Sequence, residues 1–460
     1  MKISQVFLFS AAVCANAFAD GVYTNWYDWR FVPVSRTGVD LSAECRYYSD
    51  LSAPVHGPWL TNPTATGMTI TWTTRAACGA AIDYREKGEA EFRRKWIARQ
   101  GAVDYLSKTH TLHLAGLKPA TTYEYRLVTM MAQQDYYSTE PFADSDIHAF
   151  TTMSPGAATC KAFFSTDVHG SLRLLLDPII DRGHGADSDL FFLLGDNVED
   201  GMYNDAEYWM TFCFLDDCSR KFAKERPLVA IRGNHDCSGH DASRWAEFMP
   251  RPDGNAYYTV RQGPVLFVML DCFAEWKKRT GANEQFEAYA NEMADWLKSL
   301  KSTAEWKTAT YRVAMCHFGV VDGFCVKWPR EWFGEILKDD SPEGRIHLFL
   351  CGHTHIHRRK MPGATSDAYV RFRDAKPSPL PAPKTDKAGK AVAAPVFTND
   401  YPFAEIELDI GEAMTVEADA KALKVRSWNW RDAANPTPAY DAIDISPDGK
   451  VVAVEEIVKQ

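Results

Sequence analysis

Five short groups of polar residues in this chain combine side chains that bind metal ions. Each group follows a short apolar run of the kind that forms a β-strand. Because loops at the carboxyl ends of adjacent strands share one rim of a sheet, we expect the five groups to converge in space. In chain order they are Asp167-Val168-His169, Gly195-Asp196-Asn197, Gly233-Asn234-His235-Asp236, the single His317, and Gly352-His353-Thr354-His355.

The residue types in these groups favour a centre with two metal ions. A single carboxylate can bridge two cations about 3.5–4 Å apart, the spacing used for in-line displacement at phosphorus. Asp196 suits this role because Gly195 lets the chain bend before it without a Cβ clash. The histidines complete the coordination with nitrogen, which favours Fe, Mn or Zn over Mg or Ca. The pattern therefore predicts a two-metal phosphoesterase site.

The region that carries these groups alternates between expected strands and helices from about residue 158. This alternation predicts an α/β sandwich with a mixed sheet, and strands after residue 396 are expected to complete a second sheet. Residues 373–395 are rich in Pro, Lys and Ala and are expected to form a flexible insertion. Strands are expected over 162–166, 190–194, 228–231, 313–315, 346–350, 404–408, 422–427, 442–445 and 451–457, with one or two more within 257–270, and helices over 172–180, 205–223 and 284–302.

Residues 56–152 show the short alternating strands of an all-β domain. Residues 68–73 alternate apolar and polar side chains. The stretch 117–127, with its Pro-x-x-x-Tyr turn, resembles the tyrosine-corner strand of a fibronectin type III domain. The resemblance implies a sandwich of that type with Trp72 as the buried tryptophan of the opposite sheet, and any other β-sandwich with the same turn is the alternative.

Residues 1–19 are typical of a secretory signal. The apolar run 6–15 is too short to span a bilayer, and Ala17-Phe18-Ala19 is a small-x-small site, so we expect cleavage before Asp20. The protein is therefore expected to be secreted or periplasmic, and a lipid anchor on Cys14 is a disfavoured alternative. We expect no membrane span elsewhere in the sequence.

The 460 residues are 46% hydrophobic and 24% charged, which is typical of a globular chain with two or more domains. The formal net charge of -10 argues against nucleic acid as a main partner, because a surface that follows a nucleic acid backbone needs a basic excess. The aromatic stretch 20–55 is expected to be a leading segment that packs onto a later domain. The 11 cysteines are expected to form at most one or two disulfides.

The five groups are similar to those of the calcineurin-like metallophosphoesterase superfamily over residues 158–360. Together with the preceding β-domain, the mature chain resembles the purple acid phosphatase arrangement. The resemblance implies a four-layer αββα catalytic domain over 158–460, an α+β fold that hydrolyses phosphate esters by attack of a metal-bound hydroxide. It implies a first metal site from Asp167, His169, Asp196 and His355, and a second from Asp196, Asn234, His317 and His353.

The resemblance also implies roles in the chemistry for two residues of the third group. In the superfamily, the histidine at the place of His235 contacts the scissile phosphate and assists the leaving group. Asp236, which follows it, is expected to orient or tune this imidazole.

Two positions depart from the purple acid phosphatase pattern. That family has Asp-x-Gly in the first group and, three residues after the bridging aspartate, a tyrosine that binds ferric iron and gives the colour. Here the first group is Asp-x-His and Glu199 stands at the place of the tyrosine. We therefore expect a colourless centre in which His169 replaces the tyrosinate.

The expected substrate is a small-molecule phosphomonoester. A phosphodiester, including a cyclic nucleotide, is the alternative for the same site. A catalytically dead surface-binding protein is a further alternative, although the intact set of ligands argues against it.

Several residues near the five groups have two interpretations. His240 and His357 either touch the substrate or are loop residues, and the second is favoured. Glu199 and Asp200 are favoured as solvated loop acids over supports for the metal ligands. Asp271, at the end of an apolar strand, is expected to be structural. Packing is favoured over lining of a substrate cleft for Trp209, Trp328 and Trp332.

Overall fold

The computed structural model describes residues 51–131, 142–181, 185, 187–199, 202, 205–272, 283–321, 328–373, 376–379, 384–385, 391–392, 396–428 and 439–453. The expected signal and nearly all of the expected leading segment lie outside these residues. The chain divides into two compact units. One comprises Met1–Pro58, Ile70–Leu112 and Thr122–Ala149, and the other comprises Trp59–Thr69, His113–Thr121 and Phe150–Gln460.

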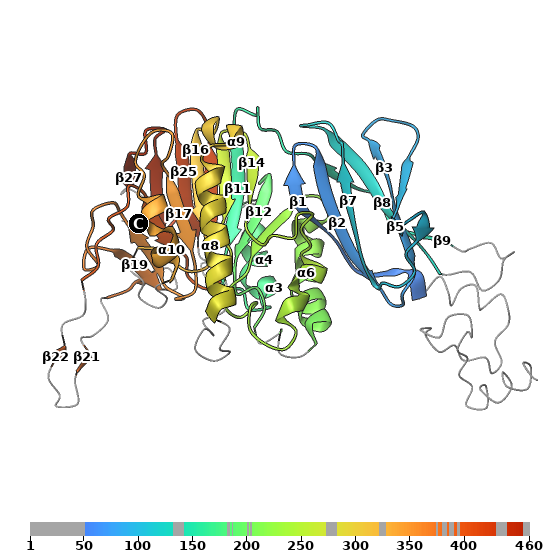
Figure 1. Ribbon diagram of the computed structural model, residues 1–460, viewed down its shortest axis with the longest axis horizontal. Coiled ribbons are helices and arrows are strands. Elements are labelled where there is room, and N and C mark those ends of the chain that lie inside the picture. Colours follow the sequence, from blue (N-terminus) through green and yellow to red (C-terminus); the bar gives the residue numbers. More distant parts are fainter. Residues whose placement is uncertain are drawn as a thin grey trace, which may run out of the picture. The chain divides into compact units, whose positions relative to one another are not determined.

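The region between residues 54 and 151 is built from β-strands, which confirms its predicted all-β class (Figure 1). In order across one sheet, the strands are β1 (Pro54–Thr64), β2 (Gly67–Thr74) and β7 (Thr109–Ala115). A second sheet of this region contains, in order, the strands β10 (His148–Thr151), β8 (Thr122–Met130), β3 (Gly79–Glu86) and β4 (Arg93–Trp96), and β9 (Phe142–Asp144) also pairs with β8. The strands β5 (Ala98–Arg99) and β6 (Ala102–Val103) form a small hairpin. The likeness to fibronectin type III domains stays a prediction.

Buried aromatic side chains occupy both of these sheets. Trp72 on β2 and Tyr125 on β8 are fully buried, which confirms the burial predicted for Trp72. Along β8, Tyr123, Tyr125 and Leu127 are buried and the residues between them are partly exposed. This alternation follows from the two-residue period of a strand.

A cluster of ion pairs joins three strands of the second of these sheets at Asp83. This carboxylate, on β3, is 3% exposed. It accepts two hydrogen bonds from Arg94 on β4, at 2.6 and 2.9 Å, and two from Arg126 on β8, at 3.1 and 2.9 Å. Burial opposes ionisation of Asp83, but the two guanidinium groups outweigh it and lower the pKa of the carboxyl group.

Two mixed β-sheets form the centre of the second unit (Figure 1). In order across the first sheet, the strands are β13 (Leu228–Ile231), β12 (Leu190–Leu194), β11 (Cys160–Ser165), β24 (Ala413–Ala418), β25 (Leu423–Trp428), β26 (Asp441–Ile445) and β27 (Val451–Ala453). In order across the second sheet, they are β14 (Tyr258–Gln262), β15 (Val265–Met269), β16 (Tyr311–Met315), β17 (Leu348–Cys351), β23 (Ala404–Glu407), β18 (His357–Lys360), β19 (Val370–Arg373) and β20 (Lys376–Pro377).

The two sheets share an apolar core that contains side chains from both. Phe164 on β11 stacks on Phe192 of β12, with ring centroids 4.5 Å apart. Phe267 of β15, in the other sheet, lies 4.6 Å from Phe192 and 5.9 Å from Phe164 between centroids. Further apolar clusters pack helices on each sheet, as Figure 1 shows for α8. These layers confirm the predicted αββα architecture.

The helices of the two outer layers come from different parts of the chain. Helices packed in the cluster of the first sheet are α3 (Leu172–Leu175), α4 (Asp177–Ile180), the π-helix η1 (Tyr208–Leu215), α5 (Asp216–Cys218), the π-helix η2 (Ser219–Ala223), the 3₁₀ turn η3 (Ala242–Arg244) and α6 (Trp245–Phe248). Those packed in the cluster of the second sheet are α8 (Asn283–Leu300), α9 (Ala304–Lys307) and α10 (Trp328–Leu337).

Some elements differ from the predictions. The helix expected over 172–180 is interrupted at Leu176, because Pro178 has no backbone N–H to donate to the carbonyl of Leu174. The helix expected over 205–223 is mostly π-helical, and neither β24 nor α10 was expected. Within the expected insertion, β20 extends the second sheet, β21 (Lys384–Thr385) pairs with β22 (Ala391–Val392), and most other residues lie outside the described part. Every cysteine in the described part is a free thiol.

Strand direction explains why the five polar groups can meet. The strands β11, β12 and β13 run parallel in the first sheet, and β15, β16, β17 and β23 run parallel in the second. Parallel strands end at one edge of a sheet, so the turns after β11, β12 and β13 are neighbours, as are those after β16 and β17.

Replacing Asp83 with asparagine should destabilise the sheet that Asp83 joins. The change leaves two partly exposed guanidinium groups without their carboxylate, and we expect a loss of about 1–3 kcal/mol in the free energy of unfolding at pH 7. The lowered pKa means that wild-type Asp83 stabilises the fold above its unfolded-state pKa of about 3.9. This advantage disappears as pH falls through the lower folded-state pKa.

Calorimetry of the full chain would measure this effect as a lower melting temperature of one thermal transition. Glu89→Gln is the control. The ion pair of Glu89 with Arg93 is largely solvated, with side chains 48% and 56% exposed, and should contribute at most about 1 kcal/mol to the free energy of unfolding. An equal shift for both variants at pH 7 would contradict the role assigned to Asp83.

Candidate metal centre

Interlocked turns position the first two polar groups. After β11, the backbone N–H of Asp167 donates to the carbonyl of Gly195 at 3.0 Å, and that of His169 donates to the carbonyl of Asp196 at 3.0 Å. The N–H of Gly170 donates to the carbonyl of Asn197 at 2.8 Å. The turns after β11 and β12 therefore hold each other in place.

Five candidate ligands have left-handed backbone, which is uncommon for residues other than glycine. Such conformations cost of order 1–3 kcal/mol each and cluster at functional sites. The sharp turns aim these side chains back across the strand ends. The φ angles are 52° for Asp167, 46° for His169, 49° for Asp196, 79° for His353 and 54° for His355.

Two glycines of the polar groups are required by close packing against the carboxylates. A Cβ atom on Gly233 would lie 2.1 Å from Oδ1 of Asp196. A Cβ atom on Gly352 would lie 2.4 Å from Oδ2 of Asp167. Any side chain at either position would displace a candidate ligand.

The first cluster of ligand atoms joins three residues from the first and last polar groups. Nε2 of His355 lies 3.1 Å from Oδ1 of Asp167 and 3.2 Å from Nε2 of His169. The ligand atoms of these three residues all lie within 4.8 Å of one another. The N–H of His353 donates to the other carboxylate oxygen of Asp167 at 3.0 Å, which fixes the orientation of the carboxylate.

The second cluster joins Asp196, His317 and His353, whose ligand atoms also lie within 4.8 Å of one another. Nε2 of His317 is 3.2 Å from Oδ2 of Asp196. Nδ1 of His317 lies 2.8 Å from the carbonyl oxygen of Leu194, so it donates its proton there and leaves Nε2 for a ligand. A third cluster joins Asp196 with His169 and His235. Asp196 therefore belongs to both the second and the third cluster.

An unpaired amide oxygen tests whether these residues fit a metal ion. Oδ1 of Asn234 is buried and makes no hydrogen bond within the described part of the chain. A buried oxygen without a partner costs about 1–3 kcal/mol, and its two chain neighbours, Gly233 and His235, both contact Asp196, so the unpaired oxygen indicates a ligand. Carboxylate and amide oxygens together with imidazole nitrogens fit a borderline divalent cation.

The electrostatics of the clusters favour positive charge between the carboxylates. Burial opposes ionisation of Asp196, but the charge of His317 outweighs it and holds the pKa of this carboxyl well below its usual range. Burial also opposes charge on His317, and Asp196 outweighs it to raise the pKa of that imidazole to about 10. Burial, reinforced by the charge of His317, lowers the pKa of His353 to about 4. Metal binding at His317 would therefore compete with a proton.

His235 and Asp236 occupy different surroundings. The N–H of His235 donates to Oδ1 of Asp196 at 2.9 Å, and its side chain is 30% exposed. The buried carboxylate of Asp236 accepts hydrogen bonds from the N–H of Gly233 at 2.7 Å and from the side chain of Asn197 at 3.0 Å. Burial, and then the charge of Asp196, raises the pKa of Asp236 to about 7.

The hydrogen bonds given to Asp236 tie the second and third polar groups together. Among the described residues they come from Gly233, Asn197 and Val198 and not from the imidazole of His235. The sequence interpretation placed this carboxylate against His235. We treat Asp236 instead as a positioning residue for the turns.

Comparison with known families agrees with this arrangement. Residues 160–357 match the family model of the calcineurin-like phosphoesterases. The chain carries a calcineurin-like phosphoesterase domain. Residues 56–152 match the N-terminal domain of purple acid phosphatases. Together these domains support a phosphoric ester hydrolase with a dinuclear metal site.

Two solved structures are similar to the chain over most of its length. The purple acid phosphatase PPD1 from yellow lupin (Lupinus luteus) seeds has 15% sequence identity and a TM-score of 0.56, over 86% of this chain and 74% of that one. PhoD has 12% identity and a TM-score of 0.51, over 86% of this chain and 91% of that one. At these identities the similarity shows a shared fold. No curated protein matches the sequence.

In the phosphoesterase domain, Glu199 supports a candidate ligand. Its Oε2 lies 2.6 Å from Nδ1 of His169, although the carboxylate is 48% exposed. A carboxylate on one ring nitrogen fixes the orientation of an imidazole whose other nitrogen binds a metal. The sequence favoured a solvated loop acid at this position; the exposure of the carboxylate agrees with that prediction, and its contact with His169 was not predicted. Asp200 lies outside the described residues.

Two buried acids of β23 hold the turns of the second sheet in place, and neither was predicted from the sequence. Glu405 accepts hydrogen bonds from the N–H groups of Val320 and Val321, at 2.6 and 3.0 Å, just after His317. Glu407 accepts a hydrogen bond from Thr354, between His353 and His355. The sequence signal that could have found them is the pair of acids in the short run Ala404–Glu407. The structure shows that this strand is buried throughout.

The other residues singled out in the sequence, two histidines and three tryptophans, make contacts that are structural. His240 is exposed and pairs with Asp241 at 2.6 Å. His357 is a fully buried strand residue, not a loop residue, and lies between Glu412 at 3.0 Å and Asp441 at 2.7 Å. The tryptophans Trp209, Trp328 and Trp332 belong to or pack against the apolar clusters, as expected.

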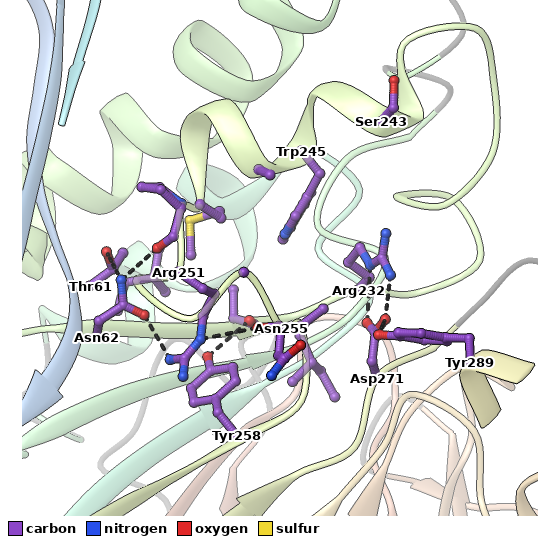
Figure 2. A pocket seen from close by; sticks show the side chains of 18 residues that line it. Thr61, Asn62, Arg232, Ser243, Trp245, Arg251, Asn255, Tyr258, Asp271 and Tyr289 are labelled. Carbon is purple, nitrogen blue, oxygen red and sulfur yellow. Dashed lines mark hydrogen bonds and ion pairs between the residues drawn. The ribbon is translucent and has the colours of Figure 1, made fainter. Parts of the chain in front are cut away.

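A cavity of about 280 Å³ lies beside the third polar group (Figure 2). At one end, Asp271 forms a two-pronged ion pair with Arg232 and accepts a hydrogen bond from Tyr289 at 2.6 Å. At the other end, Arg251 donates to Asn62 at 2.7 Å and lies over the ring of Tyr258. None of the candidate ligands lines this cavity. The contacts of Asp271 agree with its expected structural role.

Removing the side chain of Glu199 should weaken metal binding. Loss of a carboxylate that orients a ligand imidazole typically lowers metal affinity by 10- to 100-fold, and we expect a loss of about this size for Glu199→Ala. Calorimetric titration of the protein with Mn²⁺ or Zn²⁺ would measure it. The control is Glu247→Ala, because Glu247 is similarly exposed and pairs with Arg244 on the surface. Wild-type affinity in Glu199→Ala would contradict support of His169 by this carboxylate.

Proposed function

We propose that this chain hydrolyses small-molecule phosphomonoesters at a centre of two metal ions. The observation that carries the proposal is the position of Asp196, which belongs to two of the three clusters of ligand atoms. A carboxylate shared between two ligand clusters can bridge the two cations of a phosphoesterase centre. The proposed ligands are Asp167, His169, Asp196 and His355 for the first ion, and Asp196, Asn234, His317 and His353 for the second.

The protein groups around this centre have separate tasks in the proposed reaction. Two bound cations supply charge neutralisation at the phosphate and activation of water. His235 acts on the leaving oxygen as hydrogen-bond donor or acid, because its side chain is partly exposed beside Asp196. Asp236 holds the turn that carries His235.

The donor set supports a proposal for the metals. Imidazole nitrogens with carboxylate and amide oxygens favour Fe, Mn or Zn. Glu199 pairs with His169 where purple acid phosphatases have their coloured tyrosinate. We therefore propose a colourless centre.

We propose that residues 1–19 direct export of the chain and are then removed by cleavage before Asp20. The composition of that segment supports the proposal, and the segment lies outside the described residues. Among the helices of the described part, none combines the length and apolar character that crossing a membrane requires.

Removal of either Asp196 or His317 should abolish both metal binding and hydrolysis. Asp196→Ala removes the shared ligand, and His317→Ala removes a buried ligand nitrogen of the second cluster. Metal analysis of the purified variants and their rates with a chromogenic phosphomonoester would measure the two losses. His240→Ala is the control, since His240 is exposed and pairs with Asp241. Full activity in either ligand variant would refute the assignment.

A comparison of two esters separates the proposed activity from its alternatives. We expect a higher kcat/KM for a chromogenic phosphomonoester than for its bis-ester, with Mn²⁺, Zn²⁺ or Fe²⁺ between pH 5 and 9. A strong preference for the bis-ester would identify a phosphodiesterase that uses the same centre. Fewer than one metal per chain after loading, without hydrolysis of either ester, would favour a binding protein.

A further inference from the structure

Two aromatic side chains of the helix η1 are exposed to solvent. Tyr208 is 47% exposed and Phe212 is 59% exposed. Their rings stack with centroids 5.3 Å apart and planes 18° from parallel. Trp209 meets the ring of Tyr208 edge-on at 5.7 Å. A stacked pair of aromatic rings in solvent calls for an explanation, because large apolar side chains exposed together mark binding sites.

The sequence of η1 does not supply a structural reason for this exposure. The helix reads Tyr-Trp-Met-Thr-Phe-Cys-Phe-Leu, which is apolar on nearly every side. Met210, Phe214 and Leu215 already anchor it in the core. A helix that is apolar all round is normally buried all round, whereas among the described residues η1 leaves Tyr208 and Phe212 exposed. Its π-helical geometry is itself rare and is frequently found at functional sites.

Direct packing connects η1 to the turn that carries His169. A Cβ atom placed on Gly170 would lie 3.5 Å from Cβ of Cys213 and 3.8 Å from the ring of Trp209. Gly170 directly follows His169, whose ring belongs to two clusters of ligand atoms. The helix that carries the aromatic pair therefore packs on the turn that holds a proposed ligand.

The charges around η1 restrict what can bind there. Arg173 and Arg220 both pair with Asp217 of α5, and Arg220 also pairs with Asp177. Both guanidinium groups are therefore paired with carboxylates, which disfavours a polyanionic partner such as a nucleic acid or an acidic membrane. A stacked aromatic pair instead offers a planar apolar surface to a ring of similar size.

We propose that Phe212 and Tyr208 bind an aromatic ring in the leaving group of the phosphate ester, such as an aryl group or a nucleobase. The proposal rests on the proposed phosphoesterase activity and names the class of ester that this site prefers. Phe212 and Tyr208 are specificity residues that contact the organic part of the substrate, while the metal ligands act on the phosphate.

The test compares 1-naphthyl phosphate with glycerol phosphate in the metal-loaded full-length protein. For each variant the measured quantity is the kcat/KM of the naphthyl ester divided by that of the glycerol ester, relative to wild type. Normalising to wild type removes the difference in leaving-group chemistry between the two esters. We expect Phe212→Ala to lower this ratio about 5- to 20-fold, mainly through a higher KM for the naphthyl ester, as stacking on a protein ring predicts.

Two further variants separate a binding role from a structural one. Phe212→Trp should keep the ratio near the wild-type value, because it retains a ring at that position. Leu106→Ala is the control, since Leu106 is 60% exposed in the all-β region, and it should leave the ratio unchanged. Phe212→Ala with a wild-type ratio, or with equal losses for both esters, would overturn the aromatic site while leaving the phosphoesterase intact. Hydrolysis of neither ester by the wild type would overturn both proposals.

Discussion

Two buried carboxylates, Asp167 and Asp196, at the ends of adjacent strands are the constraint on which the rest of the site depends. Each is almost completely excluded from solvent, and each is held by backbone N–H groups and imidazoles from other turns. Negative charges so close together in a protein interior require compensation by cations or donors. The histidines, the amide of Asn234 and the second sheet all contribute to that compensation.

The geometry that meets this constraint is strained and closely packed. Left-handed backbone at the carboxylates and at three histidines turns the ligands toward one another, and Gly233 and Gly352 leave room for the carboxylate oxygens. Behind them, Asp236 on one side and Glu405 on the other tie the turns together through buried hydrogen bonds. The supporting residues are acids that hold backbone N–H groups, which makes the turns rigid without filling the space between the ligands.

The sequence predicted the parts of this arrangement that depend on local patterns. Apolar runs followed by polar groups located β12 and β13 and the candidate ligands, because a strand and the turn after it are coded by adjacent residues. The partners of Glu199 and Asp236 were not predicted, since their contacts depend on how separate turns pack. The π-helical form of η1 was missed for a related reason: its residues match any buried helix, and the sequence does not indicate which face remains exposed.

The distribution of the proposed ligands between the two sheets affects how the protein acquires its metals. Asp167, Asp196 and Asn234 follow strands of the first sheet, whereas His317 and His353 follow strands of the second. The centre is therefore complete only after both sheets have docked, and metal binding then stabilises the docked state. For an exported chain that folds after translocation, the compartment in which the sheets dock would determine which metals are available, beyond the preference of the ligands themselves.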